Sequence, residues 1–254
     1  MVFGKFRKTF VVGRRARKIK RVFARSFKTD SRKPDFVVTY GGDGTILYAE
    51  RLYPGIPKLA FRNHAVCEKC GLSGTPEIHI ASQKVYCDSC LEKAIEKIKR
   101  GRFEILEFRK VEAQAFFKKK GVVRSKTLVG LNDVQIHNEN HFHAVRFDFY
   151  LKGRRLHTEV IGDGVVVASV YGSTAYFRAI SRKTFSRGFG IAFNNSLVRL
   201  KPIFLKGGFR AEARILRRNA SLIADNNPEY VSLRKGDRVV FKPSRQKGRI
   251  IKLF

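Results

Sequence analysis

The chain has 254 residues and a mass of 29.0 kDa, and 43% of its residues are hydrophobic, enough for one large domain or two of ordinary size. It has no apolar run near the roughly 18 to 20 residues that a membrane-spanning helix needs. Its basic N-terminus also lacks the apolar region of a signal peptide. We therefore expect a globular, soluble protein of the cytoplasm with no membrane partner.

The charge is strongly positive. The sequence has 53 Lys and Arg against 21 Asp and Glu, which gives a formal net charge of +32. Thirteen basic residues lie between Lys5 and Lys33, where Asp30 is the only acid. Anionic partners are therefore expected. Two interpretations of the excess remain open, a solvated cationic surface or association with nucleic acid, and the second rests on charge alone.

The first hundred residues predict alternating strands and helices. Residues 9–12 and 36–40 are typical of short strands, and residues 14–27 place apolar side chains at helical spacing on a basic segment. A glycine-rich turn follows the second strand, and residues 45–53 can continue as a helix that Pro54-Gly55 ends. This order predicts an α/β unit that binds phosphate.

The second half predicts mostly strands. Residues 91–100 are strong helix formers with a stop at Gly101. The apolar period then changes from helical spacing to alternation, as in Val145, Phe147, Phe149 and Leu151. The expected strands are 134–136, 144–151, 155–161, 165–170, 211–215, 221–224, 230–233 and 238–242.

The glycine-rich turn Gly41-Gly42-Asp43-Gly44-Thr45 is the first candidate site. Glycines let a phosphate approach the backbone, because no Cβ intervenes and successive N–H groups can face one anion. Glycine sterics do not explain Asp43. A carboxylate beside an anionic ligand costs free energy unless it binds a metal, accepts ribose hydroxyl protons or acts as a base. A turn-forming role is the alternative for this residue.

The four cysteines form two pairs with the spacing of a zinc site. Cys67 and Cys70 are separated by two residues, as are Cys87 and Cys90, and the pairs are sixteen residues apart. Four thiolates in this pattern predict a closed, structural Zn²⁺ site without a catalytic role. A redox pair or a disulfide is the alternative.

Taken together, the motifs resemble those of the NAD kinases, including the shorter archaeal type. The resemblance covers roughly residues 36 to 253. It rests on Gly41–Thr45, Asn132-Asp133, Asp163-Gly164, the turn Gly172-Ser173-Thr174-Ala175-Tyr176, and Asp225-Asn226 with Gly236-Asp237-Arg238. The second glycine turn is much more specific to this family than the first.

The resemblance implies a fold and a domain division. The fold would be α/β plus all-β, with a short Rossmann-like N-terminal domain and a β-sandwich-like C-terminal domain. Residues 1–110 would form the nucleotide-binding domain, with a zinc ribbon-like insertion at 62–92. Residues 111–243 would form the NAD-binding domain, and 244–254 a tail returning to the first domain.

The resemblance also implies phosphorylation of the 2′-hydroxyl of the adenosine ribose of NAD or NADH, with ATP or polyphosphate as donor and Mg²⁺ or another divalent cation. Asp43 would be the catalytic base, and the chain would form a dimer or tetramer. The cofactor-binding residues would be Gly41, Gly42, Gly44, Thr45, Asn132, Asp133, Asp163, Thr174, Ala175 and Tyr176. Asp133 stands where the family has Glu, and we expect it to preserve the charge.

One departure leaves a second class of function open. The family's Gly-Phe-Leu stretch after the first motif is replaced by Phe61-Arg62-Asn63-His64-Ala65-Val66 and the cysteines. The predicted zinc ribbon would replace this wall of the NAD pocket. The alternative is a catalytically altered module with a kinase fold that binds NAD(H) or RNA.

Overall fold

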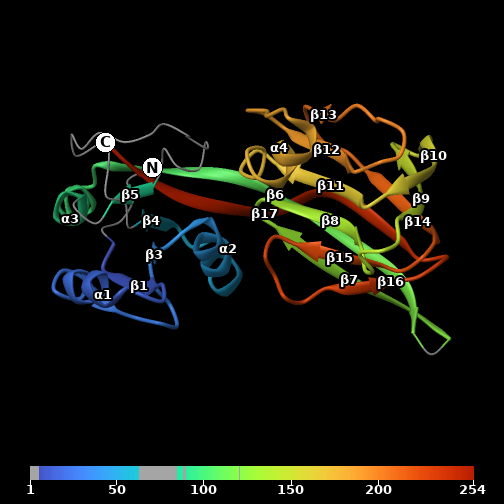
Figure 1. The fold of residues 1–254 in the computed structure, drawn as a ribbon. Coiled ribbons are helices and arrows are strands. Elements are labelled where there is room, and N and C mark those ends of the chain that lie inside the picture. The colour runs from blue at the N-terminus through green and yellow to red at the C-terminus, as the bar shows by residue number, and fades with distance from the viewer. Residues whose placement is uncertain (1–5, 63–84, 88–89, 120) are drawn as a thin grey trace. The chain divides into compact units, whose positions relative to one another are not determined.

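The computed structural model describes residues 6–62, 85–87, 90–119 and 121–254 (Figure 1). The chain divides into two compact units. Unit 1 comprises Met1–Glu107 and Lys247–Phe254, and unit 2 comprises Phe108–Gln246. Two long strands, β6 (Phe103–Lys119) and β17 (Arg238–Leu253), contribute residues to both units. Within the described residues, no helix is both long and apolar enough to cross a membrane.

Unit 1 is built on a parallel sheet. Its strands run in the order β2-β1-β3-β4, with β5 on the far side of β4, where Ile250 of β17 also pairs with Lys58. The strands are β1 (Lys8–Val12), β2 (Lys28–Thr29), β3 (Phe36–Tyr40), β4 (Lys58–Arg62) and β5 (Val85–Cys87).

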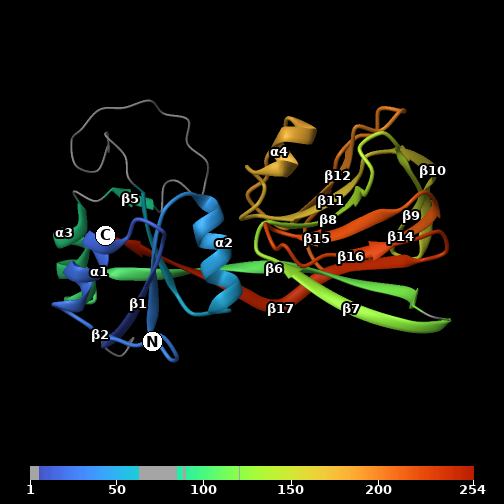
Figure 2. The same ribbon diagram turned by 60° about the horizontal axis from the view of Figure 1, so that its bottom comes forward.

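Helices cover both faces of this sheet (Figure 2). On one face, α1 (Arg17–Ala24) and α3 (Leu91–Lys99) pack through Ile19, Phe23 and Ile95 into a core that includes Phe36. On the other face, α2 (Asp43–Leu52) packs through Ala49 against Val12 and Val37. The helix expected over 14–27 is shorter than predicted, because the chain leaves α1 after Ala24 and then returns to the sheet as β2.

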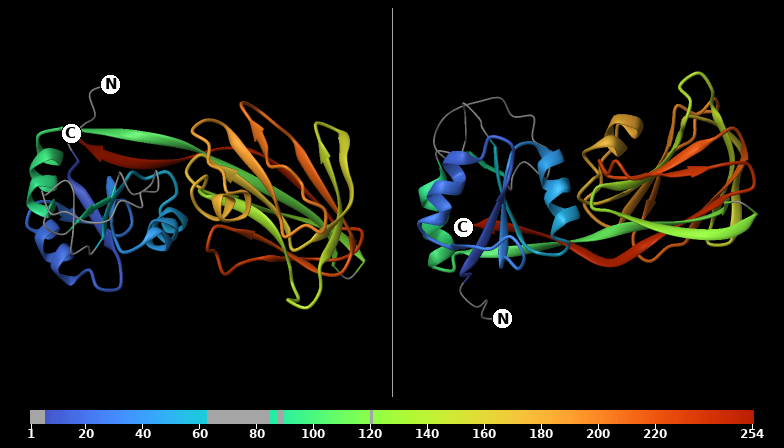
Figure 3. Two further views of the ribbon diagram at one scale, coloured as in Figure 1. Left: turned by 45° about the horizontal axis from the view of Figure 1, so that its top comes forward. Right: turned by 90° about the horizontal axis from the view of Figure 1, so that it is seen from below.

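Unit 2 is a sandwich of two antiparallel sheets (Figure 3). One sheet has the order β10-β9-β14-β17-β6-β7, and the other β13-β12-β11-β8-β15-β16. The strands not yet bounded are β7 (Val122–Gly130), β8 (Asp133–Asn138), β9 (Val145–Leu151), β10 (Arg154–Gly162), β11 (Gly164–Ser169), β12 (Phe189–Asn194), β13 (Ile203–Leu205), β14 (Ala211–Arg217), β15 (Ala220–Ala224) and β16 (Val231–Leu233).

The core of unit 2 lies between its two sheets. Phe147, Phe149 and Phe241 enter it from one sheet, and Phe189 and Phe193 from the other. Alternate residues of each strand face outward, as the period of two along a strand requires. An α/β unit and an antiparallel β-rich unit confirm the fold class expected from the sequence.

Five elements of unit 2 were not predicted. They are the hairpin strands β6 and β7, strands β12 and β13, and the short helix α4 (Tyr176–Ser181). The core residues of β6 are Val111, Ala113 and Ala115, which alternate with polar residues and give only a weak pattern. Long-range pairing with β17 and β7 makes this segment a strand.

Candidate active site

The first glycine turn connects β3 to α2 in unit 1. The N–H of Gly41 donates to the carbonyl of Phe61 at 2.9 Å, and its φ of +152° is a conformation that L side chains rarely adopt. A Cβ on Gly41 would lie 2.3 Å from the Thr45 hydroxyl oxygen. Glycine is therefore required at position 41, and the turn brings the Thr45 side chain back over the end of β3.

Asp43 is the first residue of α2, so the helix begins two residues earlier than the sequence predicted. Gly42 precedes it in an extended conformation and supplies no side-chain cap, and the space where its Cβ would lie is open. The first N–H groups of a helix lack intrahelical acceptors, and the helix dipole favours negative charge there. A phosphate can therefore approach this helix start, where the partly exposed Asp43 carboxylate also lies.

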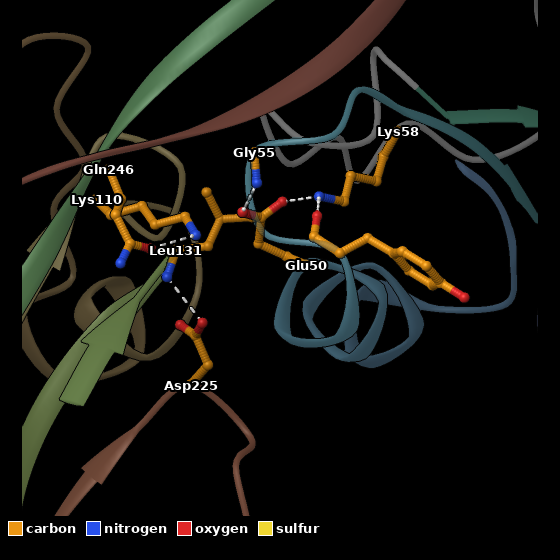
Figure 4. Close-up of polar contacts among 8 residues, drawn as sticks. Glu50, Gly55, Lys58, Lys110, Leu131, Asp225 and Gln246 are labelled. Carbon is orange, nitrogen blue, oxygen red and sulfur yellow. Dashed lines mark hydrogen bonds and ion pairs between the residues drawn. The ribbon is translucent and has the colours of Figure 1, made fainter. Parts of the chain in front are cut away.

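The far end of α2 is fixed by a buried ion pair that the sequence pattern did not reveal. Lys58 is fully buried and Glu50 is 3% exposed. The Lys58 ammonium donates to Glu50 Oε2 and, at 2.6 Å, to the carbonyl of Tyr53 (Figure 4). The other oxygen of Glu50 accepts the Gly55 N–H at 2.9 Å. These bonds attach α2, which carries Asp43, to the start of β4 within unit 1.

In unit 2, the carboxylate of Asp225 holds the turn that contains Asn132 and Asp133. It accepts the backbone N–H of Leu131 at 2.7 Å (Figure 4). It also accepts the backbone N–H groups of Asn132 at 2.7 Å and Asp133 at 3.2 Å. The Asp225 N–H in turn donates to the Asp133 carbonyl at 3.0 Å. In the sequence, Asp225 stands out only as part of a motif. Its role depends on tertiary contact and has no local signal.

The two acids of this cluster differ in protonation. Burial, with a smaller contribution from the charge of Asp225, raises the pKa of Asp133 to about 8. Burial also raises the pKa of Asp225, but the three N–H groups and nearby Lys110 oppose it and leave the value at about 6. At neutral pH, Asp225 is therefore mostly ionised and Asp133 mostly protonated. Burial therefore favours the protonated form of Asp133, whereas the sequence predicted a charged side chain at this position.

The second glycine turn packs directly on the Asn132 turn. The N–H of Ser169 donates to the Asn132 carbonyl at 2.8 Å. A Cβ on Gly172 would lie 2.2 Å from that same carbonyl oxygen, so only glycine permits the contact. Thr174 is buried, Ala175 caps α4, and Tyr176 begins it. Two motifs that are forty residues apart in the sequence therefore form one structure in unit 2.

Tyr176 and Asp163 belong to the same polar region. The Tyr176 hydroxyl accepts a hydrogen bond from the Asn194 amide at 2.9 Å. Burial raises the pKa of Tyr176, and the negative charges of Asp163 and Asp133 add to that effect. The Asp163 carboxylate accepts amide donors from Asn195 at 3.1 Å and Asn138 at 3.4 Å. The two amides fix the orientation of the Asp163 carboxylate.

Unit 2 also contains buried polar atoms with no hydrogen-bond partner among the described residues. They are Ser173 Oγ, in the second glycine turn, Gln135 Oε1 and Asn138 Oδ1. Gln135 follows Asp133 by two residues on β8 and therefore shares its face of the sheet. Unpaired buried polar groups are rare in folded proteins and indicate a water or ligand. Ser173 is the one of the three that lies in a predicted ligand-binding turn.

Most of the predicted zinc site lies outside the described residues. Cys67 and Cys70 fall there, and Cys87 is described only as part of β5. Cys90 is 8% exposed and packs in the core of unit 1 at the start of α3. Across the described positions, no three His, Cys, Asp or Glu residues form a metal-binding group.

The architecture is an α/β unit followed by an antiparallel β-sandwich, with a glycine-rich turn in each unit. Searches found no matching family model. Solved structures with this fold include a yeast NADH kinase complexed with NADH and an NAD kinase from Archaeoglobus fulgidus in complex with ATP. The first has a TM-score of 0.78 and 17% identity, over 99% of this chain and 85% of the kinase. The second has a TM-score of 0.69 and 16% identity, over 97% and 94%.

Curated sequences are also similar. A bifunctional NADP phosphatase/NAD kinase of Methanococcus maripaludis is 24% identical over 85% of this chain and 36% of its own length. An NAD kinase of Staphylococcus aureus strain JH9 is 28% identical over 59% of this chain and 51% of its own. The chain thus spans about a third to a half of the curated relatives it matches. Its fold is that of the NAD kinases, and both kinds of comparison support a relationship to that family.

Proposed function

We propose that this chain is an NAD kinase that phosphorylates the 2′-hydroxyl of the adenosine ribose of NAD or NADH. The observation that carries the proposal is the joined cluster of unit 2. There, Asp225 orders the Asn132-Asp133 turn, and Gly172 packs on that turn within the fold of NAD kinases. The similar proteins named as NAD or NADH kinases support the same activity.

Unit 2 would bind NAD. Tyr176 offers an aromatic ring to the adenine, and Thr174 and Ala175 lie on the adjacent turn. The protonated Asp133 can donate a hydrogen bond to the substrate, which an ionised carboxylate cannot do. Asn132 presents an amide beside it, and Asp163 would accept from the nicotinamide half. The orphaned Ser173 hydroxyl is a further candidate donor to the ligand.

The first glycine turn would serve the phosphates. Gly41, Gly42 and Gly44 leave the backbone accessible, and Thr45 adds a hydroxyl at the start of α2. In the reaction, the 2′-hydroxyl oxygen bonds to the transferred phosphorus while the bond from that phosphorus to the donor's leaving oxygen breaks. The hydroxyl proton passes to the Asp43 carboxylate. Such a reaction needs positioning and charge neutralisation more than covalent chemistry.

A divalent cation fits this assignment. Mg²⁺ is usually held by one or two protein carboxylates and by substrate phosphates rather than by an all-protein cage. Asp43 supplies one carboxylate at a helix start suited to phosphate. The cation, when bound, neutralises phosphate charge, and the donor is ATP or polyphosphate. A structural Zn²⁺ on the four cysteines, a dimer or tetramer, and a place in the cytoplasm remain part of the proposal.

The direct test is NADP formation by purified protein with NAD, Mg²⁺ and either ATP or polyphosphate. Asp43→Asn should retain NAD affinity and lose most turnover, roughly 10² to 10⁴-fold as for loss of a general base. Glu92→Gln is the matched control, because Glu92 is an exposed acid in the first turn of α3. Full activity of Asp43→Asn would remove the base assignment. If folded protein binds NAD but forms no NADP with either donor, the proposed kinase activity is refuted.

A further inference from the structure

The exposed side of α1, together with its flanking residues, is strongly basic. We call this surface the basic α1 face. No Asp or Glu occurs between residues 6 and 29. Asp30 follows, but its carboxylate is already engaged by Lys8 at 3.1 Å and by two backbone N–H groups. The face consists of the exposed residues Arg14, Arg15, Arg17, Lys18, Lys20, Arg21, Arg25 and Lys28.

The apolar side of α1 is committed to the core of unit 1. Ile19 is 1% exposed and Phe23 fully buried, and both contact the cluster that contains Phe36. A helix that lies in a membrane interface needs an apolar face to insert among the lipids. Since α1 has no such face left, its solvent-facing side is mainly cationic. The surface therefore fits a polyanion better than a bilayer.

A cleft opens beside the basic α1 face. Its volume is about 430 Å³, within the usual range of small-molecule sites. On the strand side, β1 pairs with β2 only at Lys8 and Thr9, so this edge of β1 continues past Thr9 without a strand partner among the described residues. The cleft is lined by Thr9, Phe10, Val11, Lys20, Arg21, Phe23, Ala24 and Thr29.

The cleft and the charges together suit one kind of ligand. Its lining combines apolar groups, among which Ala24 is exposed, with two cations, Lys20 and Arg21, which also belong to the basic α1 face. Single-stranded nucleic acids bind through a positive surface that follows the backbone and through apolar or aromatic groups that accept unstacked bases. A duplex offers no unstacked base, and polyphosphate has none at all.

We propose that the basic α1 face binds a single-stranded nucleic acid, with its phosphates on the lysines and arginines and one unstacked base in the cleft between α1 and β1. The site belongs to unit 1 and uses none of the residues assigned to NAD or phosphoryl transfer. Nucleic-acid binding at this site would account for part of the large excess of basic residues. Binding is independent of the kinase reaction.

The test is binding of fluorescent single-stranded RNA and DNA oligonucleotides to the full chain across a salt series. Arg17, Lys20 and Arg21 are changed together to Gln, which keeps helix propensity. The control changes three exposed cations of unit 2, Arg154, Lys206 and Arg210, to Gln, so both variants lose the same net charge. The α1 variant should lower the slope of log K against log salt by about 2, at roughly 0.7 for each lost phosphate contact. The control should leave the slope near the wild-type value.

A second variant tests the cleft without changing charge. Ala24→Leu places a larger side chain in the cleft at the end of α1. It should weaken binding of a normal oligonucleotide several-fold and leave binding of an abasic oligonucleotide and the salt slope unchanged. Comparison of RNA with DNA identifies which nucleic acid is preferred. Both variants should form NADP at the wild-type rate.

Several results would overturn the proposal. One is an equal loss of binding in the α1 variant and the unit 2 control, since binding would then depend on net charge and not on the basic α1 face. Another is no effect of Ala24→Leu on the normal oligonucleotide. Binding to phosphatidylserine vesicles or polyphosphate, but not to oligonucleotides, would also refute it.

Discussion

The carboxylate of Asp225 accepts a hydrogen bond of 2.7 Å from the backbone N–H of Asn132, a residue 93 positions earlier in the chain. Two further N–H groups of the same turn, from Leu131 and Asp133, bind the same carboxylate. An ionised oxygen that accepts backbone N–H groups makes stronger hydrogen bonds than a neutral acceptor. Asp225 thus orders the backbone on which the proposed NAD contacts are built.

Asp225→Asn should weaken both folding and NAD binding. The amide replaces one acceptor oxygen with a donor and leaves at least one buried N–H unpaired, at a cost of about 1 to 3 kcal/mol in the free energy of unfolding. The Michaelis constant for NAD should rise more than kcat falls. Urea unfolding and steady-state kinetics measure the two effects.

Asp237→Asn is the matched control for that variant. Asp237 is also a buried acid of unit 2, and its carboxylate accepts the Arg234 N–H at 2.7 Å and the Lys118 N–H at 3.3 Å. The Asp237→Asn substitution should destabilise the fold to a similar degree as Asp225→Asn, without a specific rise in the Michaelis constant for NAD. Equal kinetic effects of the two variants would show that Asp225 acts through general stability.

The acid Asp133 should make stability fall as pH rises. Its pKa of about 8 in the folded protein lies above the ordinary value of 3.8, so between these values the folded state holds more protons than the unfolded state. The contribution of Asp133 is therefore full below about pH 4 and lost as pH rises through 8, by up to about 1.4 kcal/mol per pH unit.

Asp133→Asn provides the measurement, because the amide resembles the protonated acid at every pH. The free energy of unfolding of this variant, relative to wild type, should increase from pH 5 to pH 8 in urea titrations. A pH-independent difference would contradict the protonated state assigned to Asp133.

Removing one partner of the buried Lys58–Glu50 ion pair should lower the free energy of unfolding substantially. Lys58→Met leaves the Glu50 carboxylate buried without its cation and should cost about 3 to 5 kcal/mol. Adding Glu50→Gln should restore part of this loss, since the amide is neutral and still has an oxygen for the Gly55 N–H. A double-mutant cycle measures the coupling. Glu96→Gln, which breaks the exposed Arg100–Glu96 pair, should change stability by less than about 1 kcal/mol.

Gly172→Ala should disrupt the second glycine turn. The added Cβ would lie within 2.6 Å of three backbone atoms of Asn132, so the turn must move. We expect a loss of NAD binding of at least tenfold, measured by calorimetry. Gly207→Ala is the control, because a Cβ at that position would meet no atom of the described residues within 4 Å. Normal NAD affinity in Gly172→Ala would show that the contact between the turns is dispensable.

The four cysteines should bind one zinc ion per chain. Elemental analysis of protein purified without chelator should give about one equivalent, and Cys90→Ser should reduce it, because a closed structural site needs all four ligands. Ser221→Ala, on the β15 strand of unit 2, is a control that should retain the metal. Absence of zinc with intact thiols would leave the cysteines without their proposed role.

Because of local steric requirements, part of the site could be predicted from the sequence. Gly41 must be glycine because of its positive φ and the nearby Thr45 hydroxyl. Both residues belong to one motif of five adjacent residues, which the sequence alone reveals. The alternation of Val145, Phe147 and Phe149 likewise follows from the period of a strand. The alternation of strands and helices in unit 1 and the basic character of α1 are equally local properties.

The tertiary structure decided the rest. Only folding brings Asp225 to the Asn132 turn and Gly172 against the Asn132 carbonyl, because these contacts join segments that are far apart in the chain. Burial, which no sequence pattern specified for Asp133, raises its pKa and favours its neutral form. The positions that require glycine and the segments rich in basic residues could be predicted from the sequence, since they depend on backbone sterics and composition. Hydrogen-bond partners and protonation depend on desolvation and long-range packing, which only the folded units supply.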